Sequence, residues 1–296
     1  MPATIIAAYN PYTGDRAPVE LALAAAEQTG ARVLAVAIYP WELSPEDTAT
    51  RSVVADALRR LQEDLGVDTR IVTDMSAPRA MHELAAHERA PLIVVGSTTR
   101  GRVGRVLTGS TAERLLQGAP CPILLAPHGY RRTRLRTIAV GFADTPEGHG
   151  ALKTAHALAA RFGARLRVIA ALHPSGALDA ALAGGLKPPR GVMLEGRHRQ
   201  ETQAALERAL QALPDGVEVE EELHVDDPAE VLLRISEHVD LLVSGSRGYG
   251  PLRSVLLGGV SRRLVDEASC PVLVLPRGVE QPLEDLLGET GTVAAG

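Results

Sequence analysis

Apolar residues along this chain fall into short unbroken runs, separated by longer segments with helical spacing. The first run spans residues 4–9, an alanine-rich segment follows at 17–29, and a second run spans 32–38. Strands that are apolar throughout are typical of a parallel sheet buried on both faces. Strands that alternate with helices in this way predict an α/β fold with helices on both faces of a parallel sheet.

The first half continues the same alternation to about residue 126. The remaining elements expected there are helices at 45–65, 78–89 and 110–117 and strands at 68–73, 92–95 and 123–126. Gly30 and Gly66 follow two of the helical segments directly, as expected of glycines that end helices. The pattern therefore predicts five strands in this half.

The order of elements is repeated in the second half. Three pairs of equivalent residues lie 149 positions apart, namely Gly96 with Gly245, Gly109 with Gly258 and Cys121 with Cys270. Nearer the start of each half, Ala31 is equivalent to Ala164, a shift of only 133 positions. The difference indicates about 16 extra residues in the second half.

The extra residues fall within 174–199, a segment rich in glycine and proline. Such a composition predicts a surface loop with a short helix near 177–183, and a lid over a ligand is the alternative. The domains are then residues 1–128 and 137–277, joined by a linker at 129–136. Four arginines in the linker favour a solvated hinge over a docking patch. The tail at 278–296 is expected to be partly disordered.

Composition excludes several classes of partner. The net charge of −5 provides no basic field for nucleic acid, and two Phe, five Tyr and one Trp provide few stacking platforms. No apolar run approaches the roughly 18 residues of a membrane helix, and no signal peptide is recognised. We expect a soluble, cytoplasmic protein without nucleic-acid or membrane partners. Cys121 and Cys270 each precede a proline at a strand entrance, which favours small buried residues over redox chemistry.

A glycine-rich segment follows the fourth strand of each half and ends where a helix begins. In the second half the candidate ligand-binding residues are Gly245, Ser246, Arg247, Gly248, Gly258, Gly259, Val260 and Ser261. In the first half they are Gly96, Ser97, Gly109 and Ser110. Backbone N–H groups in such a loop can converge on an anion, and the helix N-terminus adds the positive end of its dipole. The pattern favours phosphate binding over a purely structural tight turn.

The sequence contains no recognisable catalytic constellation. The histidines form neither a His-x3-His nor a His-Glu-x2-His pair, and neither Ser97 nor Ser246 lies in a Gly-x-Ser-x-Gly elbow. We therefore expect no rapid hydrolysis and assign no catalytic or metal-binding residue. A weak ATPase is the alternative.

The unit from Leu241 to Leu275, with Ala268-Ser269-Cys270-Pro271 before its last strand, is similar to the C-terminal signature of the universal stress protein family. The unit from Leu92 to Ala126 repeats it, so the chain looks like a tandem member. The resemblance implies a Rossmann-like, adenine nucleotide alpha hydrolase-like fold with a five-stranded parallel sheet in each domain. It also implies a stress-response regulator that binds ATP or a related adenine nucleotide at the carboxyl edge of the sheet. A scaffold that acts through protein contacts is the alternative.

Each half departs from the family's nucleotide-binding pattern, Gly-x2-Gly-x9-Gly-Ser/Thr. The second half keeps all three glycines, but Gly259 replaces the hydroxyl residue and Ser261 offers a hydroxyl two positions on. The first half keeps Gly109 and Ser110, but Thr99 replaces the second glycine. A β-branched residue is unfavourable where the backbone needs a positive φ. We therefore expect the second half to be the occupied site.

The end of the first strand departs as well. Asn10 stands where the family usually has a carboxylate; it can bind ribose hydroxyls but cannot act as a charged metal ligand. In the second half Ala143 takes that position, with Asp144 one residue later. Asp144 is expected to cap the helix that starts near Pro146, and a ligand contact is the alternative. Mg²⁺ binding is not favoured.

The tandem arrangement has a consequence for assembly. Single-domain members of the family typically dimerise, so the two halves are expected to form a pseudo-dimer within one chain. The last strand of each half, at 123–126 and 272–275, is the candidate contact. Further homodimerisation is left open by the sequence.

Overall fold

The computed structural model describes residues 2–39, 47–97, 104–173, 190–245 and 258–276. The first half contains β1 (Thr4–Ala8), α1 (Ala17–Thr29), β2 (Arg32–Tyr39), α2 (Asp47–Leu65), β3 (Asp68–Thr73), α3 (Ala77–Glu88), β4 (Ile93–Gly96), α4 (Ser110–Leu116) and β5 (Ile123–Ala126). The second half contains β6 (Thr137–Phe142), α5 (Pro146–Phe162), β7 (Arg165–Leu172), α7 (Arg190–Gln211), β8 (Val219–Val225), α8 (Pro228–Ser236), β9 (Leu241–Gly245), α9 (Gly259–Glu267) and β10 (Val272–Leu275).

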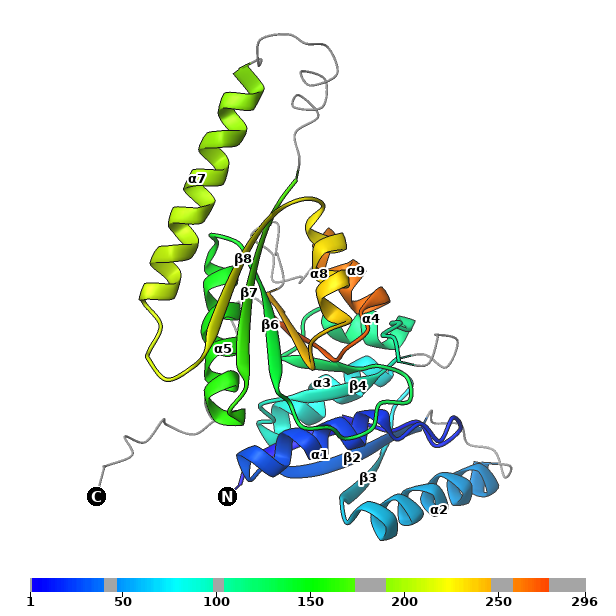
Figure 1. Cartoon of the computed structure of the whole chain (residues 1–296). Helices are drawn as coiled ribbons and strands as arrows, with labels where there is room; N and C mark the ends of the chain where they lie inside the picture. The colour runs from blue at the N-terminus through cyan, green and yellow to red at the C-terminus, as the bar shows by residue number, and fades with distance from the viewer. Residues whose placement is uncertain (1, 40–46, 98–103, 174–189, 246–257, 277–296) are drawn as a thin grey trace, which may run out of the picture.

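All ten strands join one sheet in the order β3-β2-β1-β4-β5-β10-β9-β6-β7-β8. Figure 1 shows β2, β3 and β4 of the first half in the lower part of the molecule, with β6, β7 and β8 of the second half above them. Within each half the five strands are parallel, as predicted. The strand order reverses at the first strand of each half: β1 lies between β2 and β4, and β6 lies between β7 and β9. Helices cover both faces. Crossovers between parallel strands are right-handed, so the reversal of strand order at β1 and at β6 places helices on opposite sides of the sheet.

The two halves meet through their last strands, which confirms the predicted pseudo-dimer contact. β5 and β10 pair antiparallel, with Leu124 opposite Leu273. These two residues are equivalent in the repeat, so a pseudo-twofold axis passes between them. Arg262 and Glu113 are also equivalent positions, and the Arg262 guanidinium donates to the Glu113 carboxylate at 3.0 Å. Equivalent positions of the two halves thus carry opposite charges where they meet.

Two hydrophobic layers hold the sheet between the helices. Helices α1, α2, α5 and α7 contribute to the layer on one face. Helices α3, α4, α8 and α9 contribute to the layer on the other face. Successive residues of β1 serve both, since Ile5 belongs to the first layer and Ile6 to the second. Full burial of an aliphatic side chain stabilises the fold by about 1.5–3 kcal/mol, so both faces contribute to the stability of each strand.

The prediction of a loop over 174–199 is wrong for residues 190–199, which form the first turns of α7. Glycine in a helix costs about 1 kcal/mol relative to alanine. Gly196 is exposed, and the helix is held further along by the buried side chains of Leu206 and Ala209. Residues 174–189, with the predicted short helix and the lid alternative, lie outside the described residues, as does the tail at 278–296.

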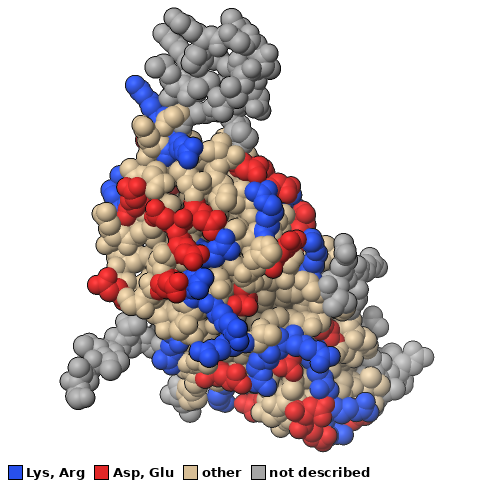
Figure 2. Space-filling view, viewed as in Figure 1, with Lys and Arg blue, Asp and Glu red and all other residues tan. Residues whose placement is uncertain are grey.

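The helix end at Gly30 and the burial of both cysteines agree with the predictions from the sequence. Gly30 ends α1 in the left-handed conformation with φ of 71°. Both cysteines are buried, and burial raises the pKa of the Cys121 thiol to about 12 and that of Cys270 well above its usual range. Acidic and basic side chains are interspersed over the visible face (Figure 2). No helix among the described residues is both long and apolar enough to span a membrane.

Most of the linker is exposed, but Leu135 is buried in the hydrophobic layer on one face of the sheet, and other linker residues make specific contacts. Arg132 donates to the Glu27 carboxylate of α1 at 2.6 Å. Asp240 accepts the backbone N–H groups of Arg136 and Thr137 at 2.8 and 2.9 Å. The linker is therefore fastened at both ends, to α1 of the first half and to the start of β9 in the second.

Candidate functional site

A cleft of about 850 Å³ opens at the carboxyl edge of the first half, beside β1 and its neighbours β2 and β4. The strand order reverses at β1, so the crossovers on either side lead away from each other and leave a crevice at the strand ends. The cleft is lined by the ends of β1, β2 and β4, the segment before α1, the start of α3, and α4 with the residues before it.

An apolar floor underlies the cleft. We use this name for Val36 and Ile38 of β2, Met81 of α3, Val95 of β4 and Ala112 of α4. All except Ile38 are buried. Val36, Met81, Val95 and Ala112 belong to the hydrophobic layer between the sheet and helices α3 and α4. The floor is therefore a rigid part of the core that is open on one side to the cleft.

A polar wall, formed by Asp15, Ser97 and Thr108, lies on the β4 side of the cleft. Asp15 precedes α1, and its Oδ1 accepts the N–H of Ala17 at 3.0 Å. Its Oδ2 is buried and has no hydrogen-bond partner among the described residues. This oxygen lies 4.0 Å from the point that a Cβ atom on Gly96 would occupy. A buried acceptor without a partner costs about 1–3 kcal/mol, so a ligand that supplies a donor here recovers that energy.

The two hydroxyl groups of the polar wall donate away from the cleft. Ser97 Oγ donates to the carbonyl oxygen of Ala126 at 2.7 Å. Thr108 Oγ1 donates to the carboxylate of Asp266, which belongs to α9 of the second half. Each hydroxyl has one hydrogen and two lone pairs, so both side chains present acceptors to a ligand.

Asn10 lies at the end of β1 on the rim of the cleft. Its Oδ1 accepts the N–H of Tyr12 at 3.0 Å, which orients the amide. The amide NH₂ is then the group that Asn10 can offer to a ligand, whereas a carboxylate at this position would offer only acceptors.

The first-half glycines shape the same cleft. A Cβ atom on Gly96 would lie 2.9 Å from Cγ of Pro18, so glycine allows α1 to approach the end of β4. Gly109 lines the cleft and is the N-cap residue of α4, with no side chain to occupy its end. Ser110 is the first residue of α4. The structure thus places Asn10, Gly96, Ser97 and Gly109 around one cleft.

The second-half candidates are only partly described. Ser246, Arg247 and Gly248 lie outside the described residues. Gly258 is the N-cap of α9, and Gly259 and Val260 begin the helix.

Ser261 is buried, and its hydroxyl donates to the carbonyl of Gly245 at 3.1 Å. It also contacts the Ser244 hydroxyl at 3.1 Å. The Ser261 side chain therefore ties α9 to the end of β9.

The expectation that Asp144 caps α5 is wrong, because Thr145 is the N-cap. The Thr145 hydroxyl accepts the N–H of Gly148 at 3.1 Å. Asp144 instead contacts Nε2 of His149 at 2.8 Å, and that ring packs edge-on against Phe142. Asp15, two residues before α1, accepts the N–H of Ala17, but the residue two after Asp144 is Pro146, which has no N–H to donate.

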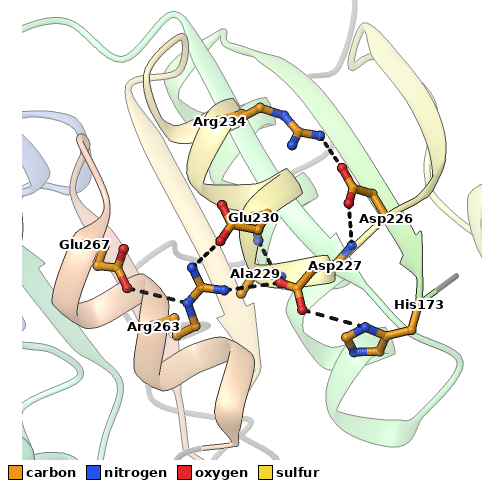
Figure 3. Close-up of polar contacts among 8 residues, drawn as sticks. All are labelled: His173, Asp226, Asp227, Ala229, Glu230, Arg234, Arg263 and Glu267. Atoms are coloured by element: carbon orange, nitrogen blue, oxygen red, sulfur yellow. Dashed lines mark hydrogen bonds and ion pairs between the residues drawn. The ribbon is translucent and has the colours of Figure 1, made fainter.

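A network of charged residues ties α8 to α9 in the second half (Figure 3). Arg263 of α9 contacts the carboxylates of Asp227 at 3.3 Å, Glu230 at 2.6 Å and Glu267 at 3.5 Å. Asp227 is the N-cap of α8, and His173 Nδ1 lies 3.6 Å from its carboxylate. The hydrogen bond to Glu230 raises the pKa of Arg263 above its ordinary value.

The described residues of the first half show no such network at the equivalent contact, between α3 and α4. There, His82 of α3 contacts the backbone carbonyl of Leu115 in α4 at 2.8 Å. Within the described residues, no group of three or more His, Cys, Asp or Glu could hold a metal ion.

Sequence reasoning missed Asp15 and Thr108. An aspartate two residues before a helix is typical of capping, and one oxygen of Asp15 does accept a helix N–H. Nothing in the sequence indicates that the other oxygen is buried without a partner. The contact between Thr108 and Asp266 spans 158 positions and depends on the docking of the two halves.

Comparisons with known proteins agree with the repeated α/β fold. A model of the universal stress protein family matches residues 1–127 and again 134–276. A universal stress protein of Mycolicibacterium smegmatis is 33% identical over 234 residues, covering 76% of this chain and 74% of that protein. One of Mycobacterium tuberculosis is 29% identical over 250 residues, 80% of each chain. A crystal structure of a putative universal stress protein from Pseudomonas aeruginosa aligns over 96% of both chains, with a TM-score of 0.65 and 16% identity. It supports the fold.

Proposed function

The chain belongs to the universal stress protein family, and from this premise we propose that it binds an adenine nucleotide in the cleft of its first half. Binding would serve a stress-response regulator that signals through its conformation and turns over little or no substrate. The second half would act mainly as a partner domain that completes the wall of the cleft.

The main support for this proposal is the cleft, through its volume, its position and the residues that line it. Its volume of about 850 Å³ falls within the range of small-molecule sites, which is roughly 300–1,000 Å³. It opens where the strand order reverses, the place at which open α/β sheets bind ligands. An apolar floor and a few polar groups at one side are what a planar base joined to a sugar requires.

The lining suggests how an adenine nucleotide would lie. The floor on the β2 side, with Val36, Ile38 and Met81, suits the base. Asn10 and the polar wall face the sugar, and the backbone of Gly96 and Gly109 leaves room for the atoms beyond it. The described residues thus fit the nucleoside part of the ligand, and they provide no cluster for a metal ion.

The second half remains a predicted second site. Its loop residues Ser246 to Gly248 lie outside the described part of the chain, and the hydroxyl of Ser261 is already bonded to Gly245. A ligand there would be bound through the backbone N–H groups of Gly258 and the residues after it. We therefore propose the first-half cleft as the principal site.

Two measurements test the proposal. Mass spectrometry of the small molecules released on denaturation identifies a co-purified nucleotide, and calorimetry with AMP, ADP and ATP measures affinity, with GTP as the comparison. Ala77 lines the cleft at the start of α3, so Ala77→Trp should fill the cleft and reduce adenine nucleotide affinity by at least tenfold. Ala86→Trp on the exposed face of the same helix is the matched control and should bind normally.

Two outcomes would count against the proposal. Equal affinity in Ala77→Trp and Ala86→Trp would place the nucleotide elsewhere, with the second-half loop as the next candidate. A chain that neither carries nor binds any adenine nucleotide would favour the scaffold alternative.

A further inference from the structure

We infer that the polar wall of the cleft selects hydrogen-bond donors, and that it recognises the ribose hydroxyls of the ligand rather than its phosphates. Asp15 is the specificity-determining residue, and Asp266 of the second half is a positioning residue that acts through Thr108. The inference rests on the proposed function, because it specifies which part of an adenine nucleotide faces the wall.

The donor groups of the polar wall are already used in bonds within the protein, whereas acceptor groups remain free. Asp15 Oδ1 accepts from Ala17, and Oδ2 remains as a buried acceptor. The hydrogens of Ser97 and Thr108 are directed to Ala126 and Asp266. All three side chains therefore present lone pairs to the cleft.

A wall of hydrogen-bond acceptors favours ligand groups that donate and disfavours groups that only accept or carry negative charge. A ribose has two hydroxyl groups that can donate, whereas a phosphate at neutral pH presents mainly acceptor oxygens and negative charge. Phosphate oxygens beside the Asp15 carboxylate would leave both partners without donors, and burying unpaired polar groups is costly. The wall therefore suits the sugar.

The location of the polar wall also favours contact with the ribose. Asp15 Oδ2 lies beside the end of β4, as its distance of 4.0 Å from the Cβ position of Gly96 shows. The β2 side of the floor, which suits the base, lies across β1 from this point. A ligand whose base covers that part of the floor places its next polar group, the ribose, at the wall.

Asp266 sets the direction of the Thr108 hydroxyl from the other half of the chain. The same segment is held by a hydrogen bond from the N–H of Val106 to the carbonyl of Ala268 at 2.7 Å. Arg105 also contacts Glu237 at 3.3 Å. Thr108 is thereby fixed between the cleft and α9, and removal of the Asp266 carboxylate would free its hydrogen to point into the cleft.

The first experiment measures adenosine, 2′-deoxyadenosine and 3′-deoxyadenosine binding to the full chain by calorimetry. Hydrogen bonds to charged groups contribute about 1.5–3 kcal/mol, so loss of a hydroxyl that Asp15 accepts should weaken binding by roughly tenfold or more. Asp15→Asn keeps an oxygen for Ala17 and replaces the free oxygen by NH₂. It should weaken adenosine by a similar factor and reduce the difference between adenosine and its deoxy analogues.

The second experiment compares Asp266→Ala with Asp266→Asn. The alanine variant frees the Thr108 hydroxyl to donate, so the affinity for AMP relative to adenosine should rise several-fold. The asparagine variant retains an acceptor for Thr108 and should restore the parent ratio. Thr108→Val combined with Asp266→Ala should abolish the gain, and a merely structural role of Asp266 would not move this ratio.

The outcomes separate the inference from the proposed function. Equal binding of adenosine and both deoxy analogues, with AMP still bound at the cleft, overturns the inference and leaves the proposed function standing. Binding of adenosine only with added MgCl₂, without dependence on its hydroxyls, also overturns it, because a cation would then occupy Asp15. If neither adenosine nor any adenine nucleotide binds the parent chain, the proposed function fails and the inference fails with it.

Discussion

In the first half the helix after the first strand begins at Ala17, whereas in the second half the equivalent helix begins a full turn earlier, at Pro146. Both helices end at equivalent glycines, Gly30 and Gly163, but α1 has 13 residues and α5 has 17. The additional turn of α5 brings the carbonyl of Glu147 to within 2.7 Å of the position that a Cβ atom on Gly245 would occupy.

The chemistry beneath the two sheet edges differs as well. Val95 and Ala112 belong to the apolar floor of the first half. Their equivalents in the second half are Ser244 and Ser261, whose hydroxyl oxygens lie 3.1 Å apart and are buried. Among the described residues, the two equivalent edges therefore differ by one helical turn and by two side chains. Among the described residues, an open cleft lies at the edge of the first half, where Asn10 follows the first strand.

Gly148→Ala should have the largest effect on stability, because it places a side chain in the tightly packed additional turn of α5. A Cβ atom there would lie 2.0 Å from the carbonyl oxygen of Ala143, so the start of the helix must move. We expect the free energy of unfolding to fall by about 3 kcal/mol, at the upper end for overpacked sites. Chemical denaturation measures it.

The matched control is Gly150→Ala on the same helix, where a Cβ atom meets open space. This variant should stabilise the chain by about 0.5–1 kcal/mol, as alanine does relative to glycine within helices. A Gly148→Ala variant as stable as Gly150→Ala would mean that the second half does not depend on the close approach at Gly148.

The buried serine pair gives an intermediate effect. Ser261→Ala removes the bonds to Gly245 and Ser244 and should cost about 1–2 kcal/mol, because it leaves buried polar groups without partners. Adding Ser244→Val reproduces the Val and Ala of the first half and should recover part of that loss. A double variant less stable than the single one would show that the second half cannot accept the apolar floor of the first.

The smallest effect concerns two equivalent aspartates, each of which directly follows the third strand of its half. Asp74 accepts from Arg79 and from the N–H of Ser76, and these bonds lower its pKa. Asp226 has a lowered pKa because it accepts from the N–H of Asp227 and from Arg234. Each carboxylate contributes stability above its unfolded pKa of about 3.9, and loses it as the pH falls through the folded pKa.

Arg79→Ala should therefore raise the pKa of Asp74 and leave that of Asp226 unchanged. Arg234→Ala should do the reverse, and carbon-detected NMR titration measures both. Because these side chains are exposed, the change in overall stability should be small. A shift of both aspartates in either variant would contradict the independence of the two halves at this position.

The sequence predicts the fold well because the signals for it are local and repeated. The apolar runs, the glycine caps and the equivalence of Cys121 with Cys270 predict two similar units, and the pairing of the last strands follows from the resemblance to dimeric relatives. The cap of α5 and the first turns of α7 depend on competition between neighbouring residues, which composition alone does not resolve.

The candidate site is harder to predict, because much of it arises from contacts between distant residues. Gly96, Ser97 and Gly109 can be found from the repeated glycine spacing, and Asn10 from the family resemblance at the end of the first strand. The free oxygen of Asp15 depends on how the segment before α1 packs, and Asp266 reaches Thr108 only after β5 and β10 have paired. The expected preference for the second half rests on loop spacing, and it stays a prediction because Ser246 to Gly248 lie outside the described residues.

The contact between Glu113 and Arg262 has a consequence for the pairing of each half. In a dimer of identical chains, a residue near the twofold axis meets its own copy, so opposite charges cannot be encoded at one position. Two halves in one chain are free of that restriction, and here the first half carries the acid while the second carries the base. Either half paired with a copy of itself in the same way would bring two like charges together at its axis.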